Sequence, residues 1–172
     1  MGFPSERRGG QMAQPPADFI ELHSHSLTTL LVIGGQAIER RAVAISFHGS
    51  SDVSSGPFVA VDCRREGERL HSALQALLAD TAPDPGPDPI RAAWSGTLFL
   101  EEADALSVEC QRMLAWFAQH TLEGAVGAEG GWPIRLAVGV SGDPDGLHFI
   151  PELRDEIDKL RIDLDEVQAG AA

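Results

Sequence analysis

Short apolar runs that alternate with helical patterns set the strongest limit on how this chain can fold. Residues 28–34, 57–63, 97–102 and 133–141 read TTLLVIG, PFVAVDC, TLFLEE and PIRLAVGVS. Such runs are typical of strands buried on both faces, as in a parallel sheet covered by helices. A short helix and a last strand follow in PELRDEIDKLRIDLDEV. We therefore predict an α/β fold, a three-layer sandwich with a parallel five-stranded sheet.

Apolar residues between the runs recur at the spacing of helices with one buried face. Val43 and Phe47 follow Glu39 in this way. Two later stripes comprise Leu70, Leu74, Leu77 and Leu78, and then Leu106, Cys110, Met113, Leu114 and Phe117. The prolines of TAPDPGPDP (81–89) exclude a helix or a central strand, so we expect an exposed loop there.

This pattern defines one α/β core domain, which we place at residues 18–167. Residues 1–17 are rich in Gly, Pro, Gln and Arg and show no periodicity, so we expect a disordered N-terminal tail. Residues 168–172 are expected to form a flexible C-terminal tail.

The charge of the chain limits its partners and its location. A net charge of −13 argues against free nucleic acid or an anionic membrane and favours a protein partner. No run approaches the ~18 apolar residues of a membrane span, and the N-terminus has no apolar signal core. We therefore expect a cytoplasmic protein. Cys63 and Cys110 lie in apolar surroundings, which indicates reduced core residues.

The stretch IGGQAIERRAVA (33–44) raises the question of a nucleotide site. It follows the first predicted strand and leads into a helix, where a strand–loop–helix unit binds phosphate. It lacks the Gly-Lys-Ser/Thr ending of such a loop. A nucleotide site, a site without its chemistry and a simple turn all fit this local pattern.

Three later stretches resemble one family. PFVAVDC, SGTLFLEEADAL and VECQRML are similar to the family patterns PFV-x-VNC, GGTLFLDEI-x-x-L and Q-x-x-LLR-x-L. The family is the central AAA+ domain, or sigma-54 interaction domain, of bacterial sigma-54-dependent transcriptional activators (enhancer-binding proteins). The matching residues are Pro57, Phe58, Val59, Val61, Cys63, Gly96, Thr97, Leu98, Phe99, Leu100, Glu102, Gln111 and Leu114. The similarity runs in order from about residue 28 to 165. It implies a P-loop NTPase (AAA+) type core and, for the family, an ATP-driven ring that remodels RNA polymerase.

The resemblance also implies a set of nucleotide-binding positions. In the degenerate phosphate loop (Walker A) they are Gly34, Gly35, Arg40 and Arg41, and the sensor position is Ser141. Ala37 and Glu39 replace two loop glycines, and a carboxylate beside polyphosphate is repulsive. We therefore expect a strand–turn–helix joint without a bound cofactor. Binding of ATP and Mg²⁺ at Arg40 is the alternative.

The acidic pair Glu101 and Glu102 lies at the position of the family's LFLDE. By resemblance it is the Walker B-like catalytic pair, with Glu102 matching the catalytic carboxylate and Glu101 replacing an aspartate. The alternative is that the two acidic residues cap the next helix through its dipole.

Other family features are changed. The two arginine-finger positions fall on Ile150 and Glu156, while Arg154 and Arg161 lie at the wrong register and are interpreted as surface charges. No GAFTGA motif occurs in the interval that should carry it. The chain ends soon after the last strand, so the family's lid and DNA-binding segment, and hence a ring or direct DNA binding, are not expected.

Three smaller patterns have structural explanations. His23 and His25 lack a second ligand pair, so no metal site is expected. Ser46, His48 and Asp52 are too close in sequence to indicate a catalytic triad. Trp94, Trp116 and Trp132 are expected in core or edge packing, with an exposed tryptophan marking a partner surface as the alternative.

These patterns together favour a sigma-54-activator-like core that is a non-hydrolysing regulatory or protein-binding module connected with transcription regulation. The expected partner is a related activator or a two-component protein. The alternative is a nucleotide-binding or weakly active ATPase of the same type, which would use Arg40, Glu101 and Glu102.

Overall fold

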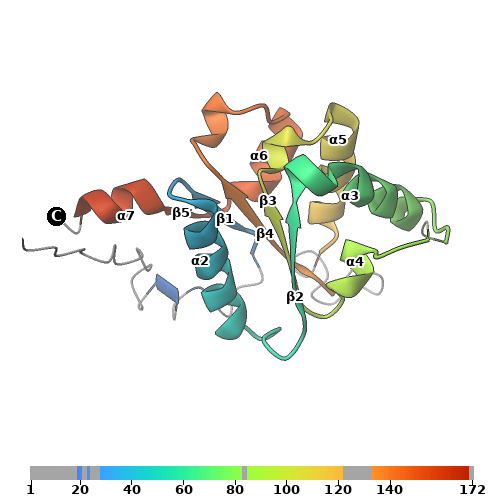
Figure 1. Ribbon diagram of the computed structural model, residues 1–172, viewed down its shortest axis with the longest axis horizontal. Helices are drawn as coiled ribbons and strands as arrows, with labels where there is room; N and C mark the ends of the chain where they lie inside the picture. The colour runs from blue at the N-terminus through green and yellow to red at the C-terminus, as the bar shows by residue number, and fades with distance from the viewer. Residues whose placement is uncertain (1–18, 21–22, 24–27, 83–84, 122–132, 171–172) are drawn as a thin grey trace, which may run out of the picture.

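The computed structural model describes residues 19–20, 23, 28–82, 85–121 and 133–170. Figure 1 shows a central parallel sheet with helices on both faces. Its strands are β1 (Leu30–Ile33), β2 (Phe58–Asp62), β3 (Thr97–Glu101), β4 (Arg135–Val140) and β5 (Leu160–Asp163). Their order in the sheet is β2-β3-β4-β1-β5. The predicted parallel five-stranded sheet is confirmed, and every strand begins and ends within its predicted run.

Two groups of helices cover the sheet. One face is covered by α2 (Ala37–Gly49). The opposite face is covered by α3 (Cys63–Leu78), α5 (Val108–Gln119) and α6 (Pro151–Ile157). The shorter elements are α4 (Pro89–Ala92), α7 (Leu164–Gly170) and the 3₁₀ turns η1 (Ala103–Ala105) and η2 (Pro144–Gly146). This arrangement is the predicted three-layer sandwich.

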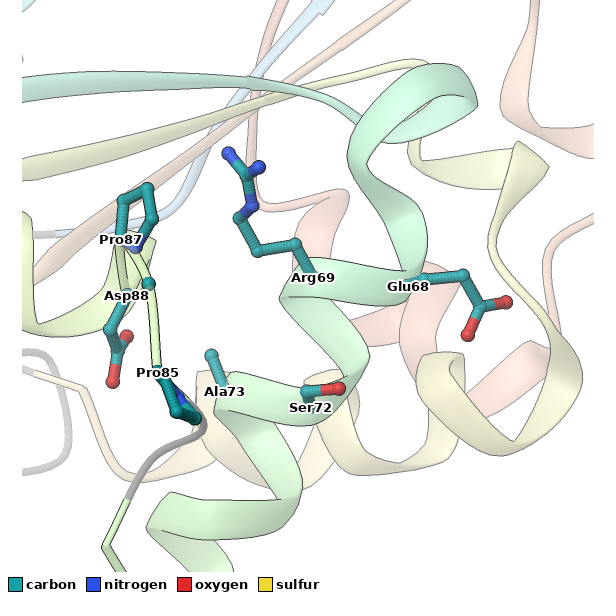
Figure 2. Close-up of a pocket in the computed structure, with 8 residues that line it drawn as sticks. Glu68, Arg69, Ser72, Ala73, Pro85, Pro87 and Asp88 are labelled. Atoms are coloured by element: carbon teal, nitrogen blue, oxygen red, sulfur yellow. The ribbon is translucent and has the colours of Figure 1, made fainter.

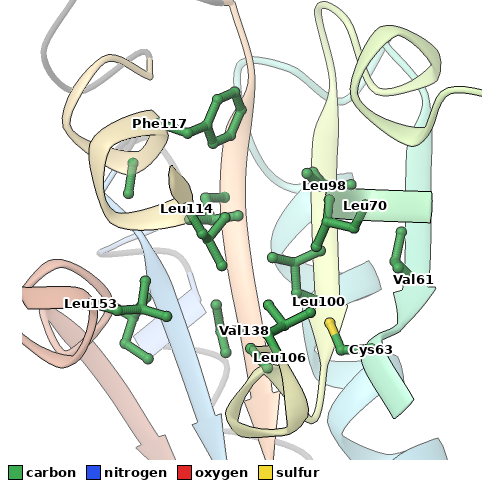
Figure 3. Packing of buried hydrophobic residues seen from close by; sticks show 14 of the residues in the cluster. Val61, Cys63, Leu70, Leu98, Leu100, Leu106, Leu114, Phe117, Val138 and Leu153 are labelled. Carbon is green, nitrogen blue, oxygen red and sulfur yellow. The ribbon is translucent and has the colours of Figure 1, made fainter. Parts of the chain in front are cut away.

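Alternate residues of β1 to β4 enter two separate cores. Leu98 and Leu100 face the larger core, which also contains Leu114 and Phe117 of α5 (Figure 3). Phe99, between the two leucines, faces the smaller core under α2. Because both faces of these four strands are covered, they carry apolar residues without alternation, which explains the runs seen in the sequence. The edge strand β5 alternates instead, with Arg161 exposed.

Side-chain caps determine where three helices begin. The Asp62 carboxylate accepts a hydrogen bond from Arg64 N–H at 3.0 Å, and Ser107 Oγ accepts from Cys110 N–H at 3.2 Å. Asp88 accepts from Ile90 N–H at 2.9 Å, so the proline-rich segment ends in the cap of α4. Such caps satisfy amides that have no partner within the helix.

The end of the chain differs from the prediction. Residues 164–170 form the helix α7, so the expected C-terminal tail begins inside a helix. The expected N-terminal tail at 1–17 lies outside the described residues.

The cysteines are buried free thiols, as predicted. Burial raises the pKa of the Cys110 thiol to about 11 and that of Cys63 further, so both remain protonated at neutral pH. The expectation for the tryptophans is wrong at two positions. Trp94 is 41% exposed and Trp116 is 44% exposed, because Trp116 lies on the face of α5 opposite Leu114. Trp132 is outside the described residues.

His48 contributes to the fold through hydrogen bonds of both its ring nitrogens. The described part of the chain contains no group of three or more metal-ligating side chains. Ser46 Oγ donates to the Ala42 carbonyl, so it does not join His48 in a triad. His48 is buried, with Nε2 3.1 Å from the Gly56 carbonyl and Nδ1 2.9 Å from Thr97 Oγ1. The carbonyl can only accept, so Nε2 carries the proton and Nδ1 accepts from the hydroxyl.

The stability of the fold is expected to fall in mild acid because of His48. Burial lowers the pKa of His48, and the nearby charge of Arg135 lowers it further, although the bond to Gly56 raises it. A folded-state pKa below the unfolded value gives stability that is present above about pH 6.5 and lost as the pH falls through the folded pKa. Urea unfolding from about pH 7 to about pH 5 should show this loss. His48→Gln should flatten the curve, whereas the exposed control His148→Gln should not. Parallel curves for the two variants would contradict the assignment.

Candidate functional site

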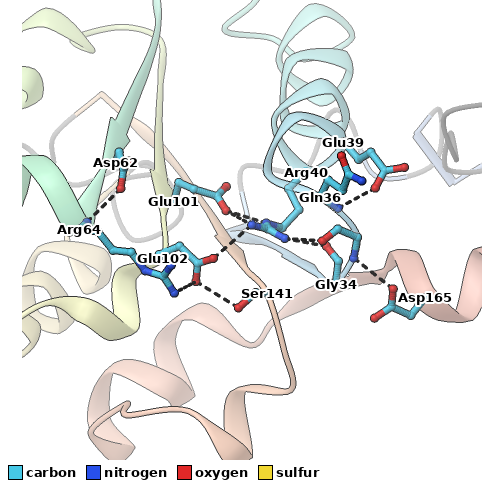
Figure 4. A network of polar contacts seen from close by, with 11 residues as sticks. Gly34, Gln36, Glu39, Arg40, Asp62, Arg64, Glu101, Glu102, Ser141 and Asp165 are labelled. Atoms are coloured by element: carbon cyan, nitrogen blue, oxygen red, sulfur yellow. Dashed lines mark hydrogen bonds and ion pairs between the residues drawn. The ribbon is translucent and has the colours of Figure 1, made fainter.

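The loop between β1 and α2 lies at the carboxyl end of the sheet, beside the ends of β3 and β4 (Figure 4). Ligands of open α/β sheets bind at this edge. Gly34 and Gly35 have φ angles of 76° and 59°, a left-handed conformation that glycine adopts without strain. The loop therefore lies between a strand and a helix, as the sequence predicted.

Arg40 connects this loop with the acidic pair. Its side chain is 3% exposed, and Nη1 donates to the carbonyls of Gly34 and Gly35, each at 2.9 Å. Its Nε lies 2.7 Å from Glu101 Oε1, and Nη2 also contacts that oxygen. Nη2 lies 3.2 Å from Glu102 Oε1 as well. All three guanidinium nitrogens are thus engaged within the protein.

Two carboxylates of the protein accept hydrogen bonds from the amides of the phosphate loop. Gln36 N–H donates to Glu39 Oε2 at 2.6 Å, and Gly35 N–H donates to Asp165 Oδ1 at 3.1 Å. Gly34 N–H donates to the Val140 carbonyl at 2.9 Å. Successive amides of this kind form the anion-binding concavity of a phosphate loop. Here they bind internal oxygens.

The acidic pair is buried in a strained turn. Glu102 is 7% exposed and has a left-handed φ of 57°, a conformation that costs free energy in residues other than glycine and is shared here by Asp80 and Ser95. Its Oε2 lies 3.4 Å from Ser141 Oγ and 3.6 Å from Arg64 Nη2. Glu102 is the N-cap residue of η1, and its side chain makes no capping hydrogen bond to that turn.

Glu101 is accommodated by a glycine on the neighbouring strand. A Cβ at Gly139 would lie 2.6 Å from Glu101 Oε2, so the missing side chain leaves room for the longer acid. This oxygen has no hydrogen-bond partner among the described residues. Burial raises the pKa of Glu101, while the contact with Arg40 lowers it and Glu102 nearby raises it.

The structure separates the remaining predicted site residues. Arg41 is exposed on α2, whereas Ser141 joins the acidic pair through Glu102. At the two finger positions, Ile150 packs against the larger core and Glu156 pairs with Lys159 at 3.2 Å. Arg154 and Arg161 form ion pairs with Asp145 and Asp158.

Two functional contacts were missed by sequence reasoning. A glycine inside a strand marks a close approach by other atoms, so Gly139 could have been suspected. Asp165 follows the last strand without any motif, and no sequence signal pointed to its contact with Gly35.

Residues 85–88, before α4, form a cleft of about 250 Å³ against α3 (Figure 2). Glu68, Arg69 and residues 85–88 contribute to its walls. Two of its charged groups are engaged locally, because Arg69 pairs with Glu66 at 3.3 Å and Asp88 caps α4.

The family pattern described as "Sigma-54 interaction domain" matches residues 10–141, which is most of the chain. The chain belongs to this family. The match includes the loop, the acidic pair and Ser141, and so agrees with the predicted resemblance. The stretch 150–165 lies beyond it, where the structure forms α6 and β5.

Solved structures show the same fold. NtrX from Brucella abortus in complex with ATP superposes with a TM-score of 0.66 at 19% identity, covering 86% of this chain and 35% of NtrX. NtrX in complex with ADP superposes with a TM-score of 0.65 at 17% identity, covering 86% of this chain and 34% of NtrX. The P-loop NTPase domain of the sigma-54 transport activator from E. coli superposes with a TM-score of 0.61 at 18% identity, covering 85% of this chain and 89% of that domain. The chain thus spans about a third of NtrX. No curated protein matches significantly.

Gln111 shows how a residue shared with the family pattern supports this sigma-54 interaction domain. Its Nε2 donates to the carbonyls of Leu106 and His148, and its Oε1 accepts from Ile150 N–H at 2.8 Å. The buried amide therefore ties α5 to the segment before α6.

Among the described helices, none is long and apolar enough to cross a membrane.

Proposed function

We propose that this sigma-54 interaction domain is a non-hydrolysing regulatory or protein-binding module connected with transcription regulation. The observation that carries the proposal is the closure of the phosphate-loop position. Arg40 binds both the loop carbonyls and the acidic pair, while Glu39 and Asp165 bind the loop amides. The groups that a nucleotide would need are engaged with one another.

Electrostatics favour this closed arrangement over a bound triphosphate. Two like charges ~4 Å apart repel by about 1 kcal/mol in water and about 4 kcal/mol at an effective dielectric of 20. A phosphate at the loop would meet the carboxylates of Glu39 and Asp165 at such separations. It would also have to draw Arg40 away from buried glutamates, leaving their charges unpaired.

Hydrolysis is further disfavoured by the residues around the site. Glu101 and Glu102 face Arg40 instead of an open position for a metal-bound water. The finger positions carry Ile150 and Glu156, and an arginine finger accounts for about 10³–10⁵ in rate in related chemistry. Both arguments support a role without turnover.

A protein partner fits the charge of the chain. With a net charge of −13, a partner with a basic surface is favoured over nucleic acid or a membrane. The proposed partner is a related activator or a two-component protein in the cytoplasm, where the buried thiols would stay reduced.

A nucleotide-binding role is the second candidate, because Arg40 retains the positive charge of the family lysine. In this case Arg40 would leave the acidic pair and contact the terminal phosphates of ATP, with Mg²⁺ near Glu101 and Glu102. NtrX, which shares the fold of this chain, has been solved with ATP and with ADP, and this shared fold supports the second candidate.

Equilibrium binding of a fluorescent ATP analogue, with and without Mg²⁺, separates the two roles. We expect no saturable binding up to about 1 mM nucleotide. Arg40→Lys keeps the positive charge at this position, and Arg41→Ala is a control for general loss of positive charge. Micromolar binding that is lost in Arg40→Ala but kept in Arg41→Ala would overturn the proposal.

A further inference from the structure

The helix α7 contacts the phosphate-loop position although 130 residues separate Gly35 from Asp165. Leu164 is fully buried, and its Cδ1 would lie 3.0 Å from a Cβ at Gly35. A Cβ at Gly34 would overlap the Asp165 carboxylate. The two glycines therefore leave room for the first turn of α7, in addition to shaping the loop.

The contact made by the Asp165 carboxylate is not needed to form α7. Asp163 Oδ1 caps the helix by accepting from Asp165 N–H at 3.0 Å and from Glu166 N–H at 3.2 Å. Leu164 anchors the helix in the smaller core. The Asp165 side chain instead points at the loop, where Figure 4 shows its bond to the Gly35 amide.

We infer that α7 is an autoinhibitory latch on the phosphate loop, an inference that rests on the proposed non-hydrolysing function. The Asp165 carboxylate and an external phosphate group compete for the same N–H of Gly35. Their charges also repel, so docking of Asp165 and occupation of the loop by an oxyanion exclude each other. Occupation of the loop is thereby coupled to the first turn of α7, at the far end of the sequence.

Hydrogen exchange of the Gly35 amide, followed by NMR on the full chain, tests the contact. Asp165→Ala is compared with Glu166→Ala, which removes the same charge from the next, exposed position of the same helix. We expect exchange at Gly35 about tenfold faster in Asp165→Ala than in the parent, and unchanged in Glu166→Ala. Equal exchange in the two variants would overturn the latch.

Titration with sodium tripolyphosphate tests the competition. Asp165→Ala should bind this oxyanion at least about tenfold more tightly than either the parent or Glu166→Ala. Equal affinity in all three proteins would overturn the competition between Asp165 and phosphate. Tight ATP binding by the parent would refute the proposed function instead. The comparison of Asp165→Ala with Glu166→Ala would still show whether Asp165 competes with phosphate for the loop.

Discussion

Replacing Arg40 with methionine is expected to destabilise the domain by about 3–5 kcal/mol, because it leaves buried Glu101 without its counter-charge and Glu102 with only the more distant Arg64. Arg40 is the cation that contacts both Glu101 and Glu102, and it also binds two loop carbonyls. Methionine replaces the aliphatic stem of arginine but not its guanidinium, so the change removes the charge, the hydrogen bonds and the volume of that group. Urea unfolding at neutral pH measures the loss.

Two further variants show whether the loss comes from the unpaired charges. Arg41→Met, at the exposed neighbouring position, should change stability by less than about 0.5 kcal/mol. Adding Glu101→Gln and Glu102→Gln to Arg40→Met should recover part of the loss, because no buried charge is then left unpaired. A loss below about 1 kcal/mol for Arg40→Met would show that solvent compensates the glutamates.

Gly96→Ala is expected to cost about 3 kcal/mol or more, because no space exists for a side chain where β2 and β3 begin. A Cβ at Gly96 would overlap the carbonyl oxygen of Pro57 and lie 2.7 Å from its nitrogen. A Cβ at Gly56 would likewise overlap the Ser95 carbonyl. Backbone atoms cannot move aside as a flexible side chain can, so the two strands would have to separate.

Thermal and urea unfolding of Gly96→Ala, beside Gly146→Ala, measure this cost. No atom lies within 4 Å of a Cβ at Gly146, so that variant should stay within about 0.5 kcal/mol of the parent. Similar midpoints for the two variants would contradict the close approach of the strands. The expected result also gives a physical reason for glycine at Gly96, which the sequence singled out only by resemblance.

The strands could be predicted because burial on both faces produces apolar runs that are easy to recognise. The helix α7 could not, because Leu160, Ile162 and Leu164 alternate as in a strand, and the pattern does not mark where the strand ends. The chain turns at Asp163, whose carboxylate caps the new helix. In α5, the apolar stripe is filled by smaller residues, which leaves Trp116 on the outer face.

The location of the candidate site was predictable from the register of the family resemblance, but its contacts were not. Arg40 and Glu101 are 61 residues apart, and their pairing depends on the space left by Gly139 on a third segment. Such a contact follows from packing across strands and leaves no local pattern. The register therefore identified the residues, while the structure showed that they bind one another.

The contacts of Arg40, Glu101, Glu102, Glu39 and Asp165 around the phosphate loop, here called the Arg40 cluster, also have an evolutionary consequence. Its groups come from the β1–α2 loop, α2, the end of β3 and, through Asp165, from α7. A lysine at position 40 alone would still meet Glu39 and Asp165 at the loop amides. An aspartate at position 101 alone would leave a gap beside Gly139. Under the proposed non-hydrolysing function, a lineage with this cluster would have to change several elements to gain a catalytic loop, and the early steps would lower stability.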